Sequence, residues 1–311
     1  MSLAFEVAAP GMLTTVQDLG RRGYRGQGVP VSGAMDPFAL QAGNLLVGNP
    51  RGAAALEMAL RGPVLRVLAD TIVAACGADF GATLSGEPLP PWESVSAHAG
   101  QTLAFGSPAR GTWAYLCVSG GIDVPEVMGS RSTYVRAGLG GLEGRPLGSG
   151  DLLQVGAPGP GAAPVRSLPL AEIPPIGQHA DVRVVLGPQE EMFSRGAIDA
   201  FFSSRYTVTP RSDRMGYRLR GERLRFEGET EILSEGVTEG SIQVPPDGQP
   251  IVLMPDCQTT GGYAKIAVAI SADLPRLAQL APGSTVRFLP ADLEEAWAAS
   301  RLLEESLARL F

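Results

Sequence analysis

Lysine, cysteine and long hydrophobic runs are scarce in this 311-residue sequence. There is one lysine, Lys265, and the net charge is −7, so binding to nucleic acid or to an anionic membrane is not expected. No apolar run reaches the roughly 18 residues of a membrane span, and the N-terminus lacks the basic-then-hydrophobic pattern of a signal peptide. We therefore expect no membrane association and a cytoplasmic location.

The few cysteines support the same compartment. Cys76, Cys117 and Cys257 are an odd number and have no metal-ligand spacing. Cys76 and Cys117 lie in apolar runs, which is typical of buried free thiols, whereas Cys257 lies in a polar stretch. Free thiols indicate a reducing, cytoplasmic setting.

Motifs that would identify a cofactor or a nucleophile are also missing. The GxxxxGK[ST] pattern of a P-loop does not occur, and residues 138–144 lack the GxGxxG spacing of a dinucleotide site. His98 and His179 lie far apart, without HExxH or paired cysteines, so no metal site is predicted. There is no GxSxG nucleophile elbow and no biotin-attachment lysine in a Met-Lys-Met setting.

The composition that is present indicates a mainly β fold. The 40 glycines and 26 prolines predict many turns and few long helices, and 44% hydrophobic residues provide a substantial core. Residues 161–180 are rich in Pro and Gly and predict a linker between domains 1–160 and 181–311. The segments 80–89 and 215–224 share five residues at a constant offset, which favours two related domains.

Two helices have clear start signals. Asp36-Pro37 provides a favoured N-cap and a favoured first helical residue, and Gly48-Asn49-Pro50 stops that helix. The glycine-rich loop 18–36 therefore ends at a helix N-terminus, a place that favours anions. Asp292 and Glu295 form a capping-box pattern before the last helix. A further helix is predicted over Glu190–Phe202.

The stretch Ile251–Ile270 contains the most unusual polar segment. It predicts strands Ile251–Met254 and Ile266–Ile270, joined by a loop longer than a simple hairpin needs. The loop supplies a carboxylate, amide and hydroxyl groups, and two glycines that let a guest approach the backbone. These residues are Asp256, Gln258, Thr259, Thr260, Gly261, Gly262 and Tyr263. The alternative is a long, solvated hairpin loop.

Other loops contain candidate ligand-binding residues, each with a structural alternative. Arg214 can grip a carboxylate while Tyr217 supplies a phenol, and Gln243 can point into a pocket. Ser132 and Thr133 either bind a ligand or tie down a turn.

Several of these segments carry the motifs of one family. The motifs are TVQDLGRRGYRGQGVPVSGAMD, NLLVGNP, GGIDVPEVMGSRST, GLGGLEGR, RMGYRL, IQVPPDGQPIVLMPD and QTTGGY. In this order, from Leu13 to Phe288, they resemble the carboxyltransferase-domain family, also described as allophanate hydrolase subunit 2. That family includes the C subunit of bacterial ATP-dependent 5-oxoprolinase and the antagonist of the kinase inhibitor KipI. Ala264 stands where the family commonly has Pro, and Cys257 where it has Gly or Ala.

The resemblance implies a fold, partners and a reaction. It implies two cyclophilin-like β-barrel domains with a few helices, and a complex with a KipI-like B subunit and a LamB/YcsF-like A subunit. That complex hydrolyses 5-oxo-L-proline to L-glutamate with ATP, which a partner would bind or share. One alternative is a biotin-dependent carboxyltransferase acting on urea or a similar small amide. Another is a non-catalytic antagonist that binds a KipI-like inhibitor.

Under the first reading the polar residues receive roles. Thr259, Thr260 and the Gly261–Gly262 amides would stabilise negative charge on the lactam oxygen, and Arg214 would meet the substrate carboxylate. Asp36 or Asp256 would orient a water or a neighbouring donor. The candidate catalytic residues are thus Asp36, Asp256, Thr259, Thr260 and Tyr263. The candidate substrate-binding residues are Ser132, Thr133, Arg214, Tyr217, Gln243, Gln258, Gly261 and Gly262.

Overall fold

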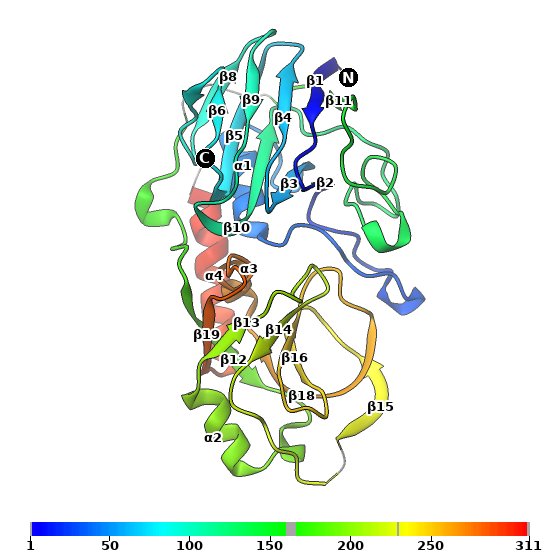
Figure 1. Ribbon diagram of the computed structural model, residues 1–311, viewed down its shortest axis with the longest axis vertical. Helices are drawn as coiled ribbons and strands as arrows, with labels where there is room; N and C mark the ends of the chain where they lie inside the picture. Colours follow the sequence, from blue (N-terminus) through cyan, green and yellow to red (C-terminus); the bar gives the residue numbers. More distant parts are fainter. Residues whose placement is uncertain (1, 160–165, 229, 310–311) are drawn as a thin grey trace. The chain divides into compact units, whose positions relative to one another are not determined.

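The computed structural model describes residues 2–159, 166–228 and 230–309. The chain forms two compact units (Figure 1). The first comprises Met1–Arg22, Ser32–Pro175 and Leu307–Phe311, and the second comprises Gly23–Val31 and Ile176–Ser306. The longest segments of the two units adjoin at 175–176, within the predicted linker 161–180, of which residues 161–165 lie outside the described part. The segment Gly23–Val31 belongs to the second unit, although the sequence places it in the first domain.

Within the described residues, the first unit contains two β-sheets, helix α1 and the last residues of α4. One sheet has the strand order β11-β1-β4-β9-β6-β7, and the other has the order β2-β3-β10-β5-β8. The strands of the first sheet are β1 Ser2–Ala9, β4 Val64–Val67, β6 Thr83–Leu84, β7 Glu87–Pro88, β9 Thr102–Ala104 and β11 Leu152–Val155. Those of the second are β2 Leu13–Gln17, β3 Ala55–Ala59, β5 Thr71–Asp79, β8 Ser94–Ala97 and β10 Arg110–Val118.

One hydrophobic core joins these two sheets. Buried side chains from both sheets, among them Phe5, Leu65, Met58 and Leu116, form a single cluster. The alternation of a strand sends every second side chain into such a core, which explains the short apolar runs of the sequence. This core stabilises the unit because burying apolar side chains is the dominant favourable term in folding.

Helix α1, Pro37–Leu46, packs against β5 and β10. The predicted cap is confirmed, because the Asp36 carboxylate accepts a hydrogen bond from the Ala39 amide at 3.0 Å. Gly43 lies over the two buried thiols of the sheet; a Cβ there would come within 2.6 Å of Cys117 Sγ and 3.2 Å of Cys76 Sγ. Both cysteines are buried and free, as predicted.

The second unit is a closed β-barrel. Its strands pair in a ring, β12-β19-β13-β14-β17-β16-β18, and β18 pairs with β12 to close it; β15 is added outside the ring on β18. The bounds are β12 His179–Leu186, β13 Tyr206–Val208, β14 Gly216–Arg220, β15 Glu231–Gly236, β16 Ser241–Val244, β17 Ile251–Leu253, β18 Thr260–Ala269 and β19 Thr285–Pro290. The prediction of a mainly β fold is confirmed.

Besides α1, the described part of the chain forms three α-helices and several short 3-10 turns. The helices are α2 Arg195–Ser203, α3 Leu274–Ala278 and α4 Leu293–Arg309. The turns are Arg25–Gln27, Val135–Ala137, Leu170–Glu172, Glu190–Met192 and Ser271–Asp273. Among the described residues, no helix combines the length and the apolar character needed to cross a bilayer.

The helix starts follow local capping chemistry. The prediction of one helix from Glu190 is wrong, because Ser194 caps α2 by accepting from the Ala197 amide at 3.2 Å. Phe201 of α2 then stacks on Phe288 of β19 with ring centroids 4.7 Å apart. The capping box before α4 is confirmed: the Glu295 amide donates to Asp292 and the Asp292 amide donates to Glu295.

Candidate functional site

Strand β18 begins at Thr260, so the polar connection from β17 is short. Thr260, Gly261 and Tyr263 lie in the strand, where they pair with β15. The prediction of a loop that continues to Lys265 is therefore wrong, and only residues 254–259 connect the two strands. The Gly-Gly pair has the composition of a loop, but both glycines lie in β18, and Gly261 pairs with Glu235 of the earlier strand β15.

A buried ion pair fixes this short connection. Arg214 Nε donates to Asp256 Oδ2 at 2.9 Å and Arg214 Nη2 donates to Asp256 Oδ1 at 3.0 Å. The Asp256 amide also donates to the Arg214 carbonyl at 2.9 Å, and both side chains are buried. The sequence predicts separate roles for these two residues toward the substrate. In the structure the planar guanidinium grips the chain's own carboxylate in a two-pronged geometry.

Arg25, which sequence reasoning did not select, also holds the connection. It belongs to the Gly23–Val31 segment of the barrel unit. Its guanidinium donates to the Val237 carbonyl, and to the Gln258 carbonyl at 3.4 Å. Arg25 and Val237 are 212 positions apart, so no sequence spacing could have indicated this contact.

Cys257 follows Asp256 and is fully buried against Val237 and Leu253. Burial raises the pKa of its thiol to about 11, with the nearby Arg25 guanidinium acting in the opposite direction. A thiol in such a site packs as a small apolar side chain and is a poor nucleophile near neutral pH.

We expect the folded protein to react with a thiol-specific disulfide reagent at pH 8 far more slowly than the denatured protein. Cys76, Cys117 and Cys257 are all buried, and burial raises the pKa of each thiol, so little thiolate is present. The release of chromophore from the reagent measures the rate, and denaturation should expose three thiols per chain. Rapid labelling that disappears in Cys257→Ser would show instead that Cys257 is open to solvent.

A set of amide groups lies at the start of β18. Gln258 Nε2 donates to Gln243 Oε1, and Gln243 Nε2 donates to the Tyr263 carbonyl, each at 3.4 Å. Gly261 makes room for them, since a Cβ at Gly261 would lie 2.5 Å from Gln243 Nε2. Sequence reasoning selected all four residues, and the structure brings them together.

An ion pair that the sequence did not predict joins β18 to β15. The ammonium of Lys265, which is 5% exposed, donates to Glu235 of β15. Gln189 Nε2 donates to the same carboxylate oxygen at 2.7 Å, and Gln189 Oε1 accepts from the Lys265 amide at 3.2 Å. The hydrogen bonds from Lys265 and Gln189 lower the pKa of Glu235, so it is charged near neutral pH. We refer to Glu235, Gln243, Gln258 and Lys265 as the Gly261 cluster.

The other candidates on the barrel have different surroundings. Tyr217 is buried and its hydroxyl donates to the Ala278 carbonyl at 2.6 Å, a contact that holds β14 near α3. The Thr259 carbonyl accepts from the Val237 amide. Thr260 is exposed and Tyr263 is 39% exposed, so both can meet a ligand. Gly262 lies beside Ser234 of β15, whose Oγ would be 3.4 Å from an added Cβ.

Asp36, Ser132 and Thr133 belong to the first unit, and all three are buried. Asp36 caps α1. Ser132 Oγ donates to Asp18 Oδ1 at 2.6 Å, and Thr133 Oγ1 donates to the Val16 carbonyl at 2.9 Å. These contacts are those of side chains that tie down a turn, which was the structural alternative for Ser132 and Thr133.

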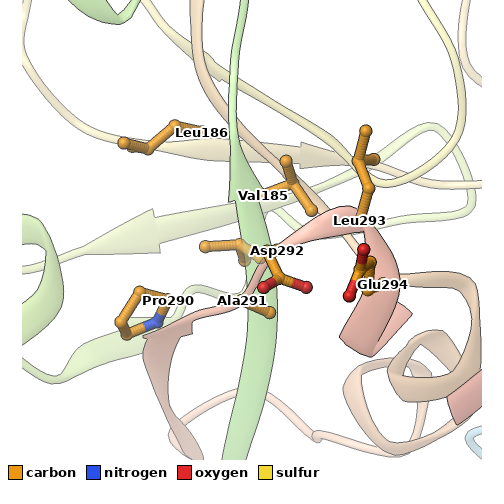
Figure 2. Close-up of a pocket in the computed structure, with 8 residues that line it drawn as sticks. Val185, Leu186, Pro290, Ala291, Asp292, Leu293 and Glu294 are labelled. Atoms are coloured by element: carbon orange, nitrogen blue, oxygen red, sulfur yellow. The ribbon is translucent and has the colours of Figure 1, made fainter. Parts of the chain in front are cut away.

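A separate open pocket of about 540 Å³ lies between the end of β12 and the start of α4 (Figure 2). Its lining is mostly apolar, and the charged side chains that Figure 2 labels in it are Asp292 and Glu294. None of the candidate site residues lines it. Two carboxylates would repel an anionic substrate, so this pocket does not suit a ligand that carries a carboxylate.

The Gly261 cluster offers the better chemistry for a small polar ligand. It combines primary amides, a buried ammonium and the neighbouring Thr260 hydroxyl, and these groups recognise carbonyl and carboxylate oxygens. The Arg214–Asp256 pair and Arg25 hold the adjoining connection in place. Within the described residues there is no group of three or more His, Cys, Asp or Glu side chains arranged to hold a metal ion.

Comparison with known proteins gives consistent matches over the chain. A sequence model of the carboxyltransferase domain, subdomain A and B, matches residues 27–290. The chain is 42% identical over 291 residues to the C subunit of 5-oxoprolinase from Escherichia coli, covering 94% of this chain and 92% of that protein. It is 40% identical over 287 residues to the C subunit of 5-oxoprolinase from Haemophilus influenzae, covering 91% of this chain and 89% of that one.

A solved structure has the same fold. The crystal structure of Kluyveromyces lactis urea carboxylase matches with a TM-score of 0.95 and 32% identity. The match covers 99% of this chain but 29% of that carboxylase, so this chain is similar to one part of a larger enzyme.

Proposed function

This chain belongs to the carboxyltransferase domain family, subdomain A and B, and from that membership we propose that it is the C subunit of an ATP-dependent 5-oxoprolinase. In this role it acts within a complex that opens the ring of 5-oxo-L-proline to give L-glutamate. The partners are a LamB/YcsF-like A subunit and a KipI-like B subunit.

One observation carries the proposal. The two bacterial proteins that are named as C subunits of 5-oxoprolinase align with this chain over about nine-tenths of both partners in each comparison. The similarity to urea carboxylase is lower and is limited to one part of a multi-domain enzyme. A relative that this chain covers almost fully is the better guide to its function.

The site fits the substrate's chemistry. 5-Oxoproline is a five-membered lactam that carries a carboxylate, so it needs donors for the lactam oxygen and a cation for the carboxylate. The exposed hydroxyl of Thr260 and the amides of the Gly261 cluster are donors of the required kind. Donors that are already fixed when negative charge develops on the lactam oxygen lower the barrier without further reorganisation.

The division of labour follows from the residues available. Asp256 is bound by Arg214, so in this proposal it positions the connection between β17 and β18 and leaves proton transfer to other groups. ATP, which activates the amide for attack by water, would be bound by a partner subunit or shared with one. Cleavage breaks the ring C–N bond, and water supplies the hydroxyl on carbon and the proton on nitrogen.

We expect the chain, co-purified with its A and B partners, to release glutamate from 5-oxo-L-proline when ATP is present. A turnover number on the order of 10 s⁻¹ would be ordinary for an enzyme. Coupled glutamate and phosphate assays measure the reaction, with ATP omitted as the control. Because this reaction needs no biotin, an excess of avidin should leave the rate unchanged.

The second candidate is a carboxyltransferase that acts on urea or a similar amide, favoured by the near-complete structural match to urea carboxylase. Activity that requires a biotinylated carrier and stops with avidin would replace the first proposal by this one. If the chain binds the B subunit tightly but neither substrate is turned over, the remaining hypothesis is a non-catalytic antagonist of a KipI-like inhibitor.

A further inference from the structure

The single lysine of the chain is an unusual cation. Lys265 is 5% exposed. Its partner Glu235 lies on β15, and the Glu235 side chain is 44% exposed. A buried ammonium needs an opposite charge, because leaving it unpaired in a low-dielectric site is costly. A carboxylate that is 44% exposed has less need of its partner, since water solvates it in part.

Strand β15 allows Glu235 to leave. It is the last strand in the order of its sheet and pairs with β18 (Figure 1). Residues 233–236 of this strand are exposed. Water can solvate the Glu235 carboxylate when it rotates outward, but the move breaks its hydrogen bond from Gln189. The buried ammonium then needs another carboxylate in its place, because leaving it unpaired is costly.

The described cations near the β17–β18 connection differ in how they are held. Arg214 is bound in two-pronged fashion by a buried carboxylate, and Arg25 donates to two backbone carbonyls that shape the connection. Releasing Arg214 would strand the buried Asp256. Of these three, Lys265 is the one whose counter-ion is a partly exposed carboxylate, which another carboxylate can replace.

Lys265 also faces the rest of the site. Successive side chains of a strand alternate, so Gly261, Tyr263 and Lys265 share one face of β18. Gln243 of the neighbouring strand pairs with Lys265 in register, and its amide occupies the space over Gly261. The ammonium is therefore on the same face as the amide donors.

We propose that Lys265 binds the carboxylate of the substrate, and that Glu235 holds the ammonium until the substrate carboxylate replaces it. This inference rests on the proposed function, from which it takes the substrate. One carboxylate is exchanged for another, so the buried ammonium stays paired throughout. Lys265 thereby selects lactams that carry a carboxylate beside the ring amide.

The test compares two ligands and four variants in the complex with the A and B partners, with ATP withheld. Calorimetry measures binding of 5-oxo-L-proline and of 2-pyrrolidinone, the same ring without the carboxylate. Lys265→Met should weaken 5-oxoproline binding by about 30- to 100-fold, the usual loss for a charge-assisted hydrogen bond. Binding of 2-pyrrolidinone should be unchanged, and Lys265→Arg should restore 5-oxoproline binding to within about tenfold of wild type.

Glu235→Gln separates this role from a structural one. Removing the competing carboxylate should tighten 5-oxoproline binding by about 3- to 10-fold, because a larger fraction of the protein has an available ammonium. A merely structural pair would give weaker binding instead. Arg287→Met is the matched control, since Arg287 pairs with Asp181 on the surface of the same barrel and should not change binding.

The outcomes distinguish this inference from the proposed function. Unchanged 5-oxoproline affinity in Lys265→Met, weaker binding in Glu235→Gln, or no 5-oxoproline binding by wild type would each overturn the role of Lys265. If Lys265→Met does not change the affinity for 5-oxoproline but the complex still turns 5-oxoproline over, the proposed function stands and only the role of Lys265 is lost. Suppose instead that binding depends on Lys265 and on the ligand's carboxylate, but the complex releases no glutamate with ATP. That result supports the carboxylate-binding role of Lys265 and overturns the proposed reaction.

Discussion

Arg214→Met is expected to lower the free energy of unfolding by about 3–5 kcal/mol, the usual cost of removing one partner of a buried ion pair. The reason is that Asp256 is 4% exposed and would lose both guanidinium hydrogen bonds. The midpoint of thermal unfolding should fall by about 10 °C, given roughly 2–4 °C per kcal/mol for domains of about 150–250 residues. Urea denaturation followed by circular dichroism measures the change.

The double variant Arg214→Met/Asp256→Leu provides the internal comparison. Replacing both charges with apolar side chains removes the stranded carboxylate, so much of the lost stability should return. Arg287→Met serves as the exposed control, because that pair is about 40% exposed on both sides and should change stability by about 0–1 kcal/mol. A loss below about 1 kcal/mol in Arg214→Met, together with weaker substrate binding, would instead give Arg214 the substrate-binding role that the sequence predicted.

Local chemistry made much of the fold predictable. Asp36 and the Asp292/Glu295 capping box mark helix starts within a few residues, so the signals for α1 and α4 are contained in the segments themselves. The many glycines and prolines likewise predicted a mainly β chain. Where a nearer cap competes, as at Ser194 before α2, counting apolar positions places the helix start too early.

The extent of β18 could not be predicted in the same way. Thr260, Gly261 and Gly262 have the composition of a loop, and they become strand because β15 lies beside them. Register between strands depends on which segments meet, and a single sequence does not contain that information. The same limit hid Arg25, whose partners lie more than 200 positions away.

The sequence predicted which residues belong to the candidate site better than it predicted what each residue does there. Residue type selected Arg214 and Asp256 because each can serve a polar ligand, yet the structure pairs them with each other. Conversely, Lys265 drew attention only as the single lysine, since its neighbours Gln189 and Glu235 are distant in sequence. Charge pairs form between side chains that the fold brings together, so composition identifies the groups but not their partners.

Gly261→Ala is expected to reduce kcat/KM of the complex by about 10²-fold or more, since a shift of about 1 Å in a positioning group can have that effect. The added Cβ would lie 2.5 Å from Gln243 Nε2, so the amide must move. Its hydrogen bonds to Gln258 and to the Tyr263 carbonyl would then be lost or rearranged. The atom displaced first is the end of a side chain, so the free energy of unfolding should change by less than about 2 kcal/mol.

Gly236→Ala tests whether the effect comes from this position and not from any glycine in the paired strands. Gly236 lies opposite Thr260 in the β15–β18 pairing, and a Cβ there would meet nothing within 4 Å. Its kinetics and thermal unfolding should therefore match those of wild type. If Gly261→Ala retained full kcat/KM at unchanged stability, the amides above β18 would have no part in the reaction. Equal losses in both variants would point to the pairing of β15 with β18 in place of the cluster, because a change in that pairing is the effect the two substitutions would share.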